Sequence, residues 1–198
     1  MWPDGEMSHY FDKHPDTAFV LSEIQARLRG KEYSLFVSPG VFSSKKIDKG
    51  TLLLIDAMHV KGKVLDLGCG IGVVGMVAGV EGCKVWCSDV NKRALALAKR
   101  NTKKYGVKAT ITQSNVYDNI KETFNVIVSN PPQHAGMEIC MRIIQQASCH
   151  LVKGGSLQVV ARRNKGGARF SKLMEKTFGN VTVLAKKGGY WVYKSVLE

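Results

Sequence analysis

Two acids and a run of glycines have the types and spacing needed to hold a nucleoside ligand. In DLGCGIG (66–72), Asp66 ends an apolar run and is followed by Gly68, Gly70 and Gly72. Glycines in this position permit a tight turn and let a ligand approach the backbone, while the following helix offers its N-terminal amides. A second acid, Asp89, ends the next apolar run, KVWCSD. An acid in that place can accept hydrogen bonds from ribose hydroxyls.

The glycine pattern leaves two ligands to consider. Gly70, Gly72 and Gly75 also fit the GxGxxG pattern of nicotinamide dinucleotide sites, which alone is a weak signal. Asp66 would place a carboxylate beside the phosphates of a dinucleotide, whereas the same carboxylate suits an ammonium group. A nucleoside that carries an amino-acid tail and no phosphate fits both acids, so we expect S-adenosylmethionine. Helix capping by Asp66 and Asp89 is the simpler alternative.

A third loop, QSNVYD, follows the next predicted strand and should flank the adenine. There Asn115 could bond the edge of the base and Val116 could pack on its face, with Asp118 as an alternative acid. The predicted cofactor contacts are Asp66, Gly68, Cys69, Gly70, Gly72, Asp89, Val90, Asn115, Val116 and Asn130.

The stretch SNPPQH carries the residues predicted to present the substrate. Pro131 and Pro132 have no N–H, and a proline after Asn130 holds that residue extended. The acceptors that remain are the Asn130 side-chain oxygen and a backbone carbonyl, which match the two donors of an exocyclic NH₂ group. We therefore predict Asn130, Pro131 and Pro132 as the catalytic residues of an N-methyltransferase. A turn that merely ends a strand is the simpler alternative.

The elements that must position these residues follow an α/β pattern. Asn91 is a predicted N-cap for a helix that reaches Tyr105, and Gly154–Gly155 should turn the chain into a strand. Further helices are expected from the glycine loop to about residue 80, over 167–178, and along an apolar face of Ile139, Ile143, Ala147 and Leu151. Predicted strands lie at 63–67, 84–89, 108–113, 124–130, 156–161, 181–185 and 190–196, the last two forming a hairpin. This order predicts a doubly wound, mostly parallel seven-stranded sheet with a C-terminal antiparallel hairpin.

The first 60 residues have a different pattern. RLRGKEYSLFVSPGVFS alternates as a strand pair does, and DKGTLLLIDAMHV resembles a helix that leads into the first core strand. We expect residues 1–60 to be an extension packed on a methyltransferase domain of residues 61–198, in one structural domain.

Charge is the strongest signal in the composition. The 198 residues carry 29 Lys and Arg against 16 Asp and Glu, a net charge of +13. The stretches 91–105 and 162–176 hold six basic residues each, with no acid in the first and one in the second. This distribution favours a polyanionic partner, RNA or a ribonucleoprotein, over solvated helix faces alone.

Several other classes are disfavoured by the sequence. Five cysteines without a CxxC pair argue against a disulfide framework or a metal site. No apolar run approaches the roughly 18 residues that span a bilayer, and the polar N-terminus is not a typical signal peptide. We expect a cytoplasmic protein with no membrane partner and no bound metal.

The assembled motifs resemble the methyltransferase small domain family, which includes ribosomal RNA small-subunit guanine-N2 methyltransferases and single-domain archaeal relatives. The resemblance covers nearly the whole chain, through HYF (9–11), LRG (28–30), PGVFS (39–43), DKGTLLL, DLGCGIGVVG, DVNKRAL, SNPP with Gly136, LVKGG and the final GGYWVYKS. It implies a class I Rossmann-like methyltransferase fold that uses S-adenosylmethionine. It also implies that guanine N2 of ribosomal RNA, free or in a ribosomal subunit, is the acceptor.

The chain departs from the family at two points. Gln133 stands where many members carry an aromatic or bulky apolar residue that can stack on the target base, so stacking would come from elsewhere, such as His134 or Phe42, or be weaker. Phe42, Gln133 and His134 are the predicted substrate contacts. Larger bacterial members have an added N-terminal domain, so we expect RNA placement here to rely on the basic surface of the chain or on a partner. The alternatives are DNA adenine N6 or a protein glutamine as acceptor, an NAD-linked oxidoreductase, and an inactive RNA-binding module.

Overall fold

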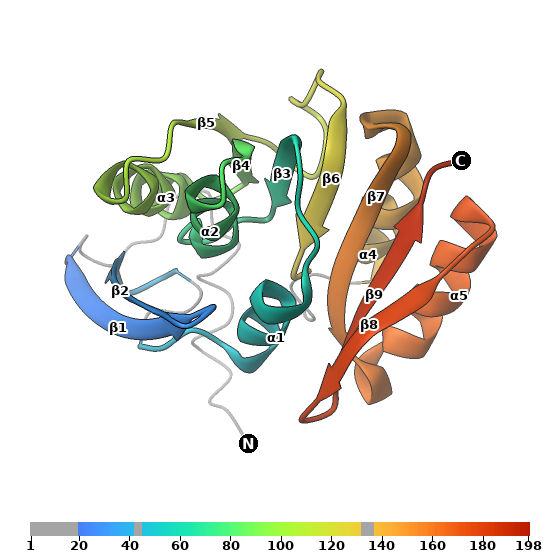
Figure 1. Ribbon diagram of the computed structural model, residues 1–198, viewed down its shortest axis with the longest axis horizontal. Coiled ribbons are helices and arrows are strands. Elements are labelled where there is room, and N and C mark those ends of the chain that lie inside the picture. The colour runs from blue at the N-terminus through green and yellow to red at the C-terminus, as the bar shows by residue number, and fades with distance from the viewer. Residues whose placement is uncertain (1–19, 42–44, 132–136) are drawn as a thin grey trace.

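A computed structural model describes residues 20–41, 45–131 and 137–198 of the chain, and within them the larger sheet has seven strands (Figure 1). The spatial order is β5-β4-β3-β6-β7-β9-β8. The neighbours from β5 to β7 pair in parallel, whereas β9 is antiparallel to both β7 and β8. The strands are β3 (Lys63–Leu67), β4 (Lys84–Asp89), β5 (Ala109–Gln113), β6 (Phe124–Ser129), β7 (Leu151–Arg162), β8 (Thr182–Lys187) and β9 (Tyr190–Val196). The predicted α/β class, the seven strands and the C-terminal hairpin are confirmed.

Helices cover both faces of this sheet because its strands alternate between two apolar faces. On β3, Val64 belongs to a core cluster shared with α1, α2 and α3, whereas Leu65 and Leu67 belong to a second cluster shared with α4 and α5. The helices are α1 (Lys49–Ala57), α2 (Val73–Val80), α3 (Lys92–Lys104), α4 (Met137–Ala147) and α5 (Gly167–Phe178), with short 3₁₀ turns at Ser148–His150 and Arg163–Lys165.

The strand order places the two predicted motifs side by side. From β3 the chain passes through α2, β4 and α3 to β5 at one edge, and then returns to form β6 on the other side of β3. Ligands of such sheets bind where the strand order reverses, at the carboxyl ends of the strands. The glycine loop follows β3 and Asn130 follows β6, so both lie at this reversal point.

Two predictions about the second half of the sheet were wrong. Leu151 does not continue the apolar face of α4, because the helix ends at Ala147 and Leu151 begins β7. Gly154 and Gly155 do not precede the strand but lie within it, where the pairing of β6 with β7 shifts between Phe124 and Val126. A Cβ on Gly155 would come within 2.7 Å of the Val152 carbonyl oxygen, so this irregular stretch requires a glycine.

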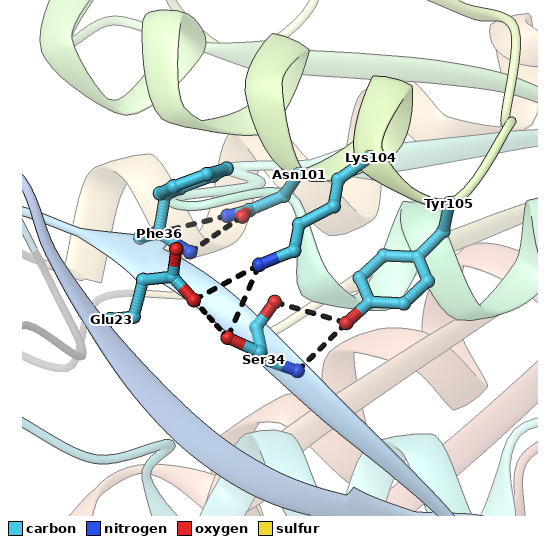
Figure 2. Close-up of polar contacts among 6 residues, drawn as sticks. All are labelled: Glu23, Ser34, Phe36, Asn101, Lys104 and Tyr105. Carbon is cyan, nitrogen blue, oxygen red and sulfur yellow. Dashed lines mark hydrogen bonds and ion pairs between the residues drawn. The ribbon is translucent and has the colours of Figure 1, made fainter.

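The N-terminal strands β1 (Ser22–Leu28) and β2 (Lys31–Val37) form an antiparallel hairpin that is held by side chains of α3 (Figure 2). The Tyr105 hydroxyl accepts from the Ser34 amide at 2.7 Å and donates to the Ser34 carbonyl at 3.0 Å. The Asn101 amide does the same for Phe36, at 2.7 Å and 3.1 Å. These side chains therefore replace a neighbouring strand on the outer edge of β2.

Asn101 also connects this hairpin to the glycine loop. Its Nδ2 donates to the Ile71 carbonyl at 2.9 Å, and the residue is fully buried. β2 and α1 share the first core cluster with β3 and α2. The proposed division of the chain at residue 60 therefore crosses a shared core, and it stays a prediction.

We expect Asn101→Ala to destabilise the fold by roughly 1–3 kcal/mol or more, because each buried backbone group left without a partner carries such a cost. Urea unfolding followed by circular dichroism measures it. Lys104→Ala is the matched control on the same helix, since it removes exposed contacts of Nζ with Glu23, Ser34 Oγ and the Phe36 ring but leaves no buried backbone group without a partner. Equal losses in the two variants would contradict the bridging role of Asn101.

Candidate active site

The glycines of the loop after β3 divide into two pairs with different roles. Gly68 and Gly70 have φ of +71° and +52°, and a Cβ placed on either would meet no atom within 4 Å. A Cβ on Gly72 would lie 2.7 Å from Ala98 Cβ, and one on Gly75 would lie 2.6 Å from Cys87 Sγ. The first pair leaves space beside the backbone, and the second lets α2 pack closely on α3 and the sheet.

Asp66 is a buried acid, and one of its two side-chain oxygens accepts a hydrogen bond from the backbone of α2. Its Oδ2 accepts from the Gly75 amide at 2.8 Å, so the capping alternative describes one of its roles. Burial raises the pKa of Asp66 to about 7, with the Gly75 bond opposing the shift and the charge of Asp89 adding to it. Among the described residues no donor reaches Oδ1. A cationic donor at that oxygen would stabilise the ionised carboxylate.

Asp89 holds the glycine loop from the neighbouring strand. Its Oδ2 accepts from the Gly70 amide and its Oδ1 from the Asn91 amide, both at 2.9 Å. Burial raises the pKa of Asp89, and these backbone bonds oppose the shift. Each carboxylate oxygen has two lone pairs, so acceptor capacity remains for hydroxyl groups of a ligand.

A cavity of about 370 Å³ lies between the residues that follow β4 and the loop after β5. It brings together the predicted residues Val90 and Asn115 and the alternative acid Asp118, and the sequence prediction missed the other four residues that line it. Its lining consists of Val90, Lys92, Gln113, Ser114, Asn115, Asp118 and Asn119.

The loop that carries Asn115 has a strained residue at its centre. Val116 has φ of +55°, which is rare for a β-branched residue, and its side chain lies in the second core cluster instead of lining the cavity. The Ser114 hydroxyl donates to the Val116 carbonyl at 2.8 Å and accepts from the Asn119 amide at 3.0 Å. These bonds maintain the turn, which leaves Asn115 exposed at the cavity.

The side-chain amide of Asn130 is held in one orientation by α1. Its Nδ2 lies 2.9 Å from Thr51 Oγ1, and 3.2 Å and 3.4 Å from the two carboxylate oxygens of Asp48. Thr51 Oγ1 itself donates to the Asp48 carboxylate. Because a carboxylate only accepts, the NH₂ group of Asn130 must face Asp48. Its Oδ1 therefore faces away as a free acceptor among the described residues.

Asp48 is held in place by the helix that it begins. Its Oδ1 accepts from the Gly50 amide at 2.8 Å and the Thr51 amide at 3.2 Å, which makes it the N-cap of α1. The sequence prediction placed this helix but assigned no role to Asp48 or Thr51. The acid and the threonine three residues later in DKGT are the signal of a cap, whereas their contact with Asn130 depends on the tertiary structure.

The remaining predicted residues are placed as follows. Cys69 is buried, and the neighbouring Cys87 thiol together with burial holds its pKa well above the usual range. Pro131 is buried directly after Asn130. Phe42, Pro132, Gln133 and His134 lie outside the described residues. Asn91 caps α3 as predicted, and its Nδ2 also donates to the Gly40 carbonyl at 3.4 Å.

Comparison with known proteins assigns the chain to a family. Residues 32–194 match the family described as methyltransferase small domain. The chain belongs to this family. A Bacillus subtilis relative described as uncharacterized protein YbxB is 32% identical over 195 residues, which are 94% of this chain and 97% of that protein. Ribosomal RNA small subunit methyltransferase C of Actinobacillus pleuropneumoniae is 37% identical over 177 residues, 84% of this chain and 53% of that protein.

The fold has a matching solved structure. The T. thermophilus 16S rRNA N2 methyltransferase, in complex with AdoMet and guanosine, superimposes with a TM-score of 0.83 and 27% identity, over 93% of this chain and 52% of that one. The chain thus spans about half the length of the ribosomal RNA methyltransferases that it matches. Membership of a methyltransferase family sets aside the NAD-linked interpretation of the glycine pattern.

The described residues contain neither a membrane-spanning helix nor a cluster of metal-binding side chains. None of the helices within 20–41, 45–131 and 137–198 is both long and apolar enough to cross a membrane. In the same ranges, no group of three or more His, Cys, Asp or Glu side chains could hold a metal ion.

We expect Asp48→Asn to release the amide of Asn130 without unfolding α1. Asparagine caps helices about as well as aspartate, so stability should change by less than about 0.5 kcal/mol. The new NH₂ group would face that of Asn130, and one of the two amides must then turn over. The side-chain amide resonances of Asn130 and their exchange with water report this change. Asp56→Asn, an exposed position on α1, is the control and should leave these resonances unchanged.

Proposed function

We propose that this chain transfers a methyl group from S-adenosylmethionine to an exocyclic amine of RNA, and that the amine is guanine N2 of ribosomal RNA. The observation that carries the proposal is the fixed amide of Asn130, with Nδ2 bound to Asp48 and Thr51 and Oδ1 left as an acceptor. This oxygen lies at the carboxyl end of β6, beside the glycine loop after β3.

The chain's own residues fit the cofactor. Gly68 and Gly70 leave open space beside the backbone, and the cavity lined by Val90 and Asn115 can receive the adenine. Asp89 would accept hydrogen bonds from the ribose hydroxyls, and Asp66 Oδ1 from the ammonium group. When bound, S-adenosylmethionine supplies an electrophilic methyl group on a sulfonium, so the acceptor amine need not lose a proton before transfer.

The role of Asn130 is to bind and orient the target amine. Its Oδ1 accepts from one N–H, and a backbone carbonyl beside it accepts from the other, which directs the nitrogen lone pair toward the cofactor site. Asp48 and Thr51 are positioning residues, because they keep the NH₂ group of Asn130 away from the substrate. Proximity and alignment then provide the acceleration.

The choice of substrate rests on charge and on the relatives. The net charge of +13 favours a nucleic acid. The similar proteins are a small-subunit ribosomal RNA methyltransferase and a 16S rRNA N2 methyltransferase that was solved with guanosine. The target base would have to leave its stack to reach Asn130.

The proposal predicts that Asn130→Ala loses methyl transfer while it keeps the cofactor. We expect kcat for RNA to fall by about 100-fold or more, since the amine loses an orienting acceptor. Transfer of labelled methyl to RNA, DNA and protein fractions identifies the substrate, and calorimetry with S-adenosylhomocysteine measures cofactor affinity. Label on DNA adenine or on protein glutamine would replace RNA as the substrate. Undiminished transfer by Asn130→Ala would contradict the role of Asn130.

A second prediction concerns the proton on Asp66. Because its pKa is raised to about 7 in the folded state, above the value in the unfolded chain, this acid stabilises the fold less as pH rises from about 4 to 7. An ammonium group at Oδ1 lowers the pKa, so binding near pH 6.5 should release protons from Asp66. Calorimetry with S-adenosylhomocysteine in buffers of different ionisation enthalpy measures the release.

Asp66→Asn is the control for this measurement, because it keeps an acceptor but carries no titrating proton. We expect it to bind S-adenosylhomocysteine more weakly and without proton release. Equal proton release in the variant and in the unmodified protein would show that Asp66 does not face the ammonium group.

A further inference from the structure

The turn between β8 and β9 lies next to the residues that orient Asn130. A Cβ placed on Gly50 would lie 3.0 Å from Asp48 Oδ1 and also 3.0 Å from Tyr190 Cε1, so the carboxylate and the ring flank the same point of α1. In Figure 1 this turn is at the lower edge of the molecule, beside α1 and beyond the end of β7. The start of the C-terminal hairpin strand β9 therefore lies against the end of α1 that holds the Asn130 amide.

Cations lie on aromatic rings at this end of the sheet. The Arg162 guanidinium is 4.9 Å from the centre of the Tyr190 ring, and Arg163 is 4.4 Å from the Trp191 ring. Lys186 Nζ is 4.1 Å from the Trp191 ring. We call the set Arg162, Arg163, Lys186, Lys187, Tyr190 and Trp191 the hairpin platform.

The pairing register distributes the hairpin platform around the end of the sheet. Arg162 and Lys187 are both opposite Tyr190 and share one face with it. Ala161 and Lys186 are both opposite Trp191, on the other face. Both faces therefore present a ring with a cation beside it.

The charge of the hairpin platform is not neutralised within the fold. Its four cations are exposed, and in the part of the chain that the structure describes none of them forms an ion pair. Neither 151–174 nor 182–196 contains an acidic residue. The other basic stretch is placed differently, because α3 supports β2 and its Lys104 pairs with Glu23. The two basic stretches predicted from sequence are therefore not equivalent.

We propose that the hairpin platform binds the single-stranded RNA that flanks the target nucleotide. The proposal rests on the proposed function, because it takes Asn130 as the point where the target base enters. A guanidinium next to a ring can offer its free side to a base and its edge to a phosphate, and aromatic rings stack on bases of any sequence. Only unstacked bases can use such rings, which favours a single strand over a duplex.

This arrangement would also provide the stacking that Gln133 does not. The residue after the second proline is a glutamine, so the chain lacks an aromatic side chain at that position of the motif. Tyr190 lies beside Gly50 of α1, and the proposal places a neighbouring nucleotide on its ring and on Arg162. Recognition of the strand would thus shift from the NPP loop to the hairpin.

The test compares two variants with the same change in charge. Arg162→Ala/Arg163→Ala removes the two guanidinium groups of the hairpin platform, and Lys99→Ala/Lys103→Ala removes two exposed cations from α3. The probe is a mixed-sequence 12-nucleotide RNA, and fluorescence anisotropy measures its dissociation constant over a range of salt concentrations.

We expect the arginine variant to bind this RNA about tenfold or more weakly, with a salt slope lower by about 1.4. The lysine variant should change the dissociation constant by less than about twofold. Arg162→Lys/Arg163→Lys, which keeps the charge without the planar group, should retain the salt slope but still bind more weakly. Equal losses in the two alanine variants would indicate that RNA is attracted by the overall positive charge, and they would contradict the proposal that the hairpin platform binds it.

Methyl transfer separates failure of this proposal from failure of the proposed function. In the arginine variant the KM for RNA should rise while kcat and the affinity for S-adenosylhomocysteine are kept. Suppose that the unmodified protein methylates RNA and that the arginine variant has the same KM and the same RNA affinity. The proposed RNA binding by the hairpin platform is then wrong, and the proposed function stands. Suppose instead that the unmodified protein methylates no RNA, and that RNA binding is lost in the arginine variant and kept in the lysine variant. The hairpin platform is then an RNA-binding site, and the proposed function is wrong.

Discussion

The carboxylate of Asp48 can only accept hydrogen bonds, and this constraint orients the acceptor amide at the end of β6. The Asp48 side chain accepts from the otherwise unpaired backbone amides at the start of α1, and it also fixes the Asn130 side-chain amide. Because Thr51 also bonds both groups, the amide cannot turn over without placing its oxygen against the Asp48 carboxylate, which has no donor to offer. Helix α1 is thus joined to the carboxyl end of β6 by three polar side chains, those of Asp48, Thr51 and Asn130.

The proposed cofactor site, in contrast, depends on two buried acids whose negative charges the fold only partly compensates. Asp66 and Asp89 are buried close enough for the charge of one to raise the pKa of the other, and backbone amides compensate only part of that burial. A site of this kind favours a ligand that brings a positive charge and hydroxyl donors. The glycines beside the acids leave the space for such a ligand, and Asn101 connects their loop to β2.

Much of the fold could be predicted because each strand alternates with a period of two and the turns use glycine or a capping residue. The limits of β3, β4 and α5 match the expected ranges, and Asn91 caps α3. The errors occurred where local pattern and tertiary pairing disagree. Leu151 keeps the spacing of the α4 face, but pairing with β6 assigns it to β7. The predicted roles of Gln133, His134, Phe42 and Pro132 lie outside the described residues and stay predictions.

By itself the sequence determined the element order, the acids at the ends of β3 and β4, and the asparagine before two prolines, since these depend on local spacing and residue chemistry. Only the tertiary structure decided which groups meet. Strand order brings β3 next to β6, the capped end of α1 orients Asn130, and the β8–β9 turn lies against Gly50. Such contacts join residues that are tens of positions apart, and hydrogen bonds and packing between them leave no periodic signal in the chain.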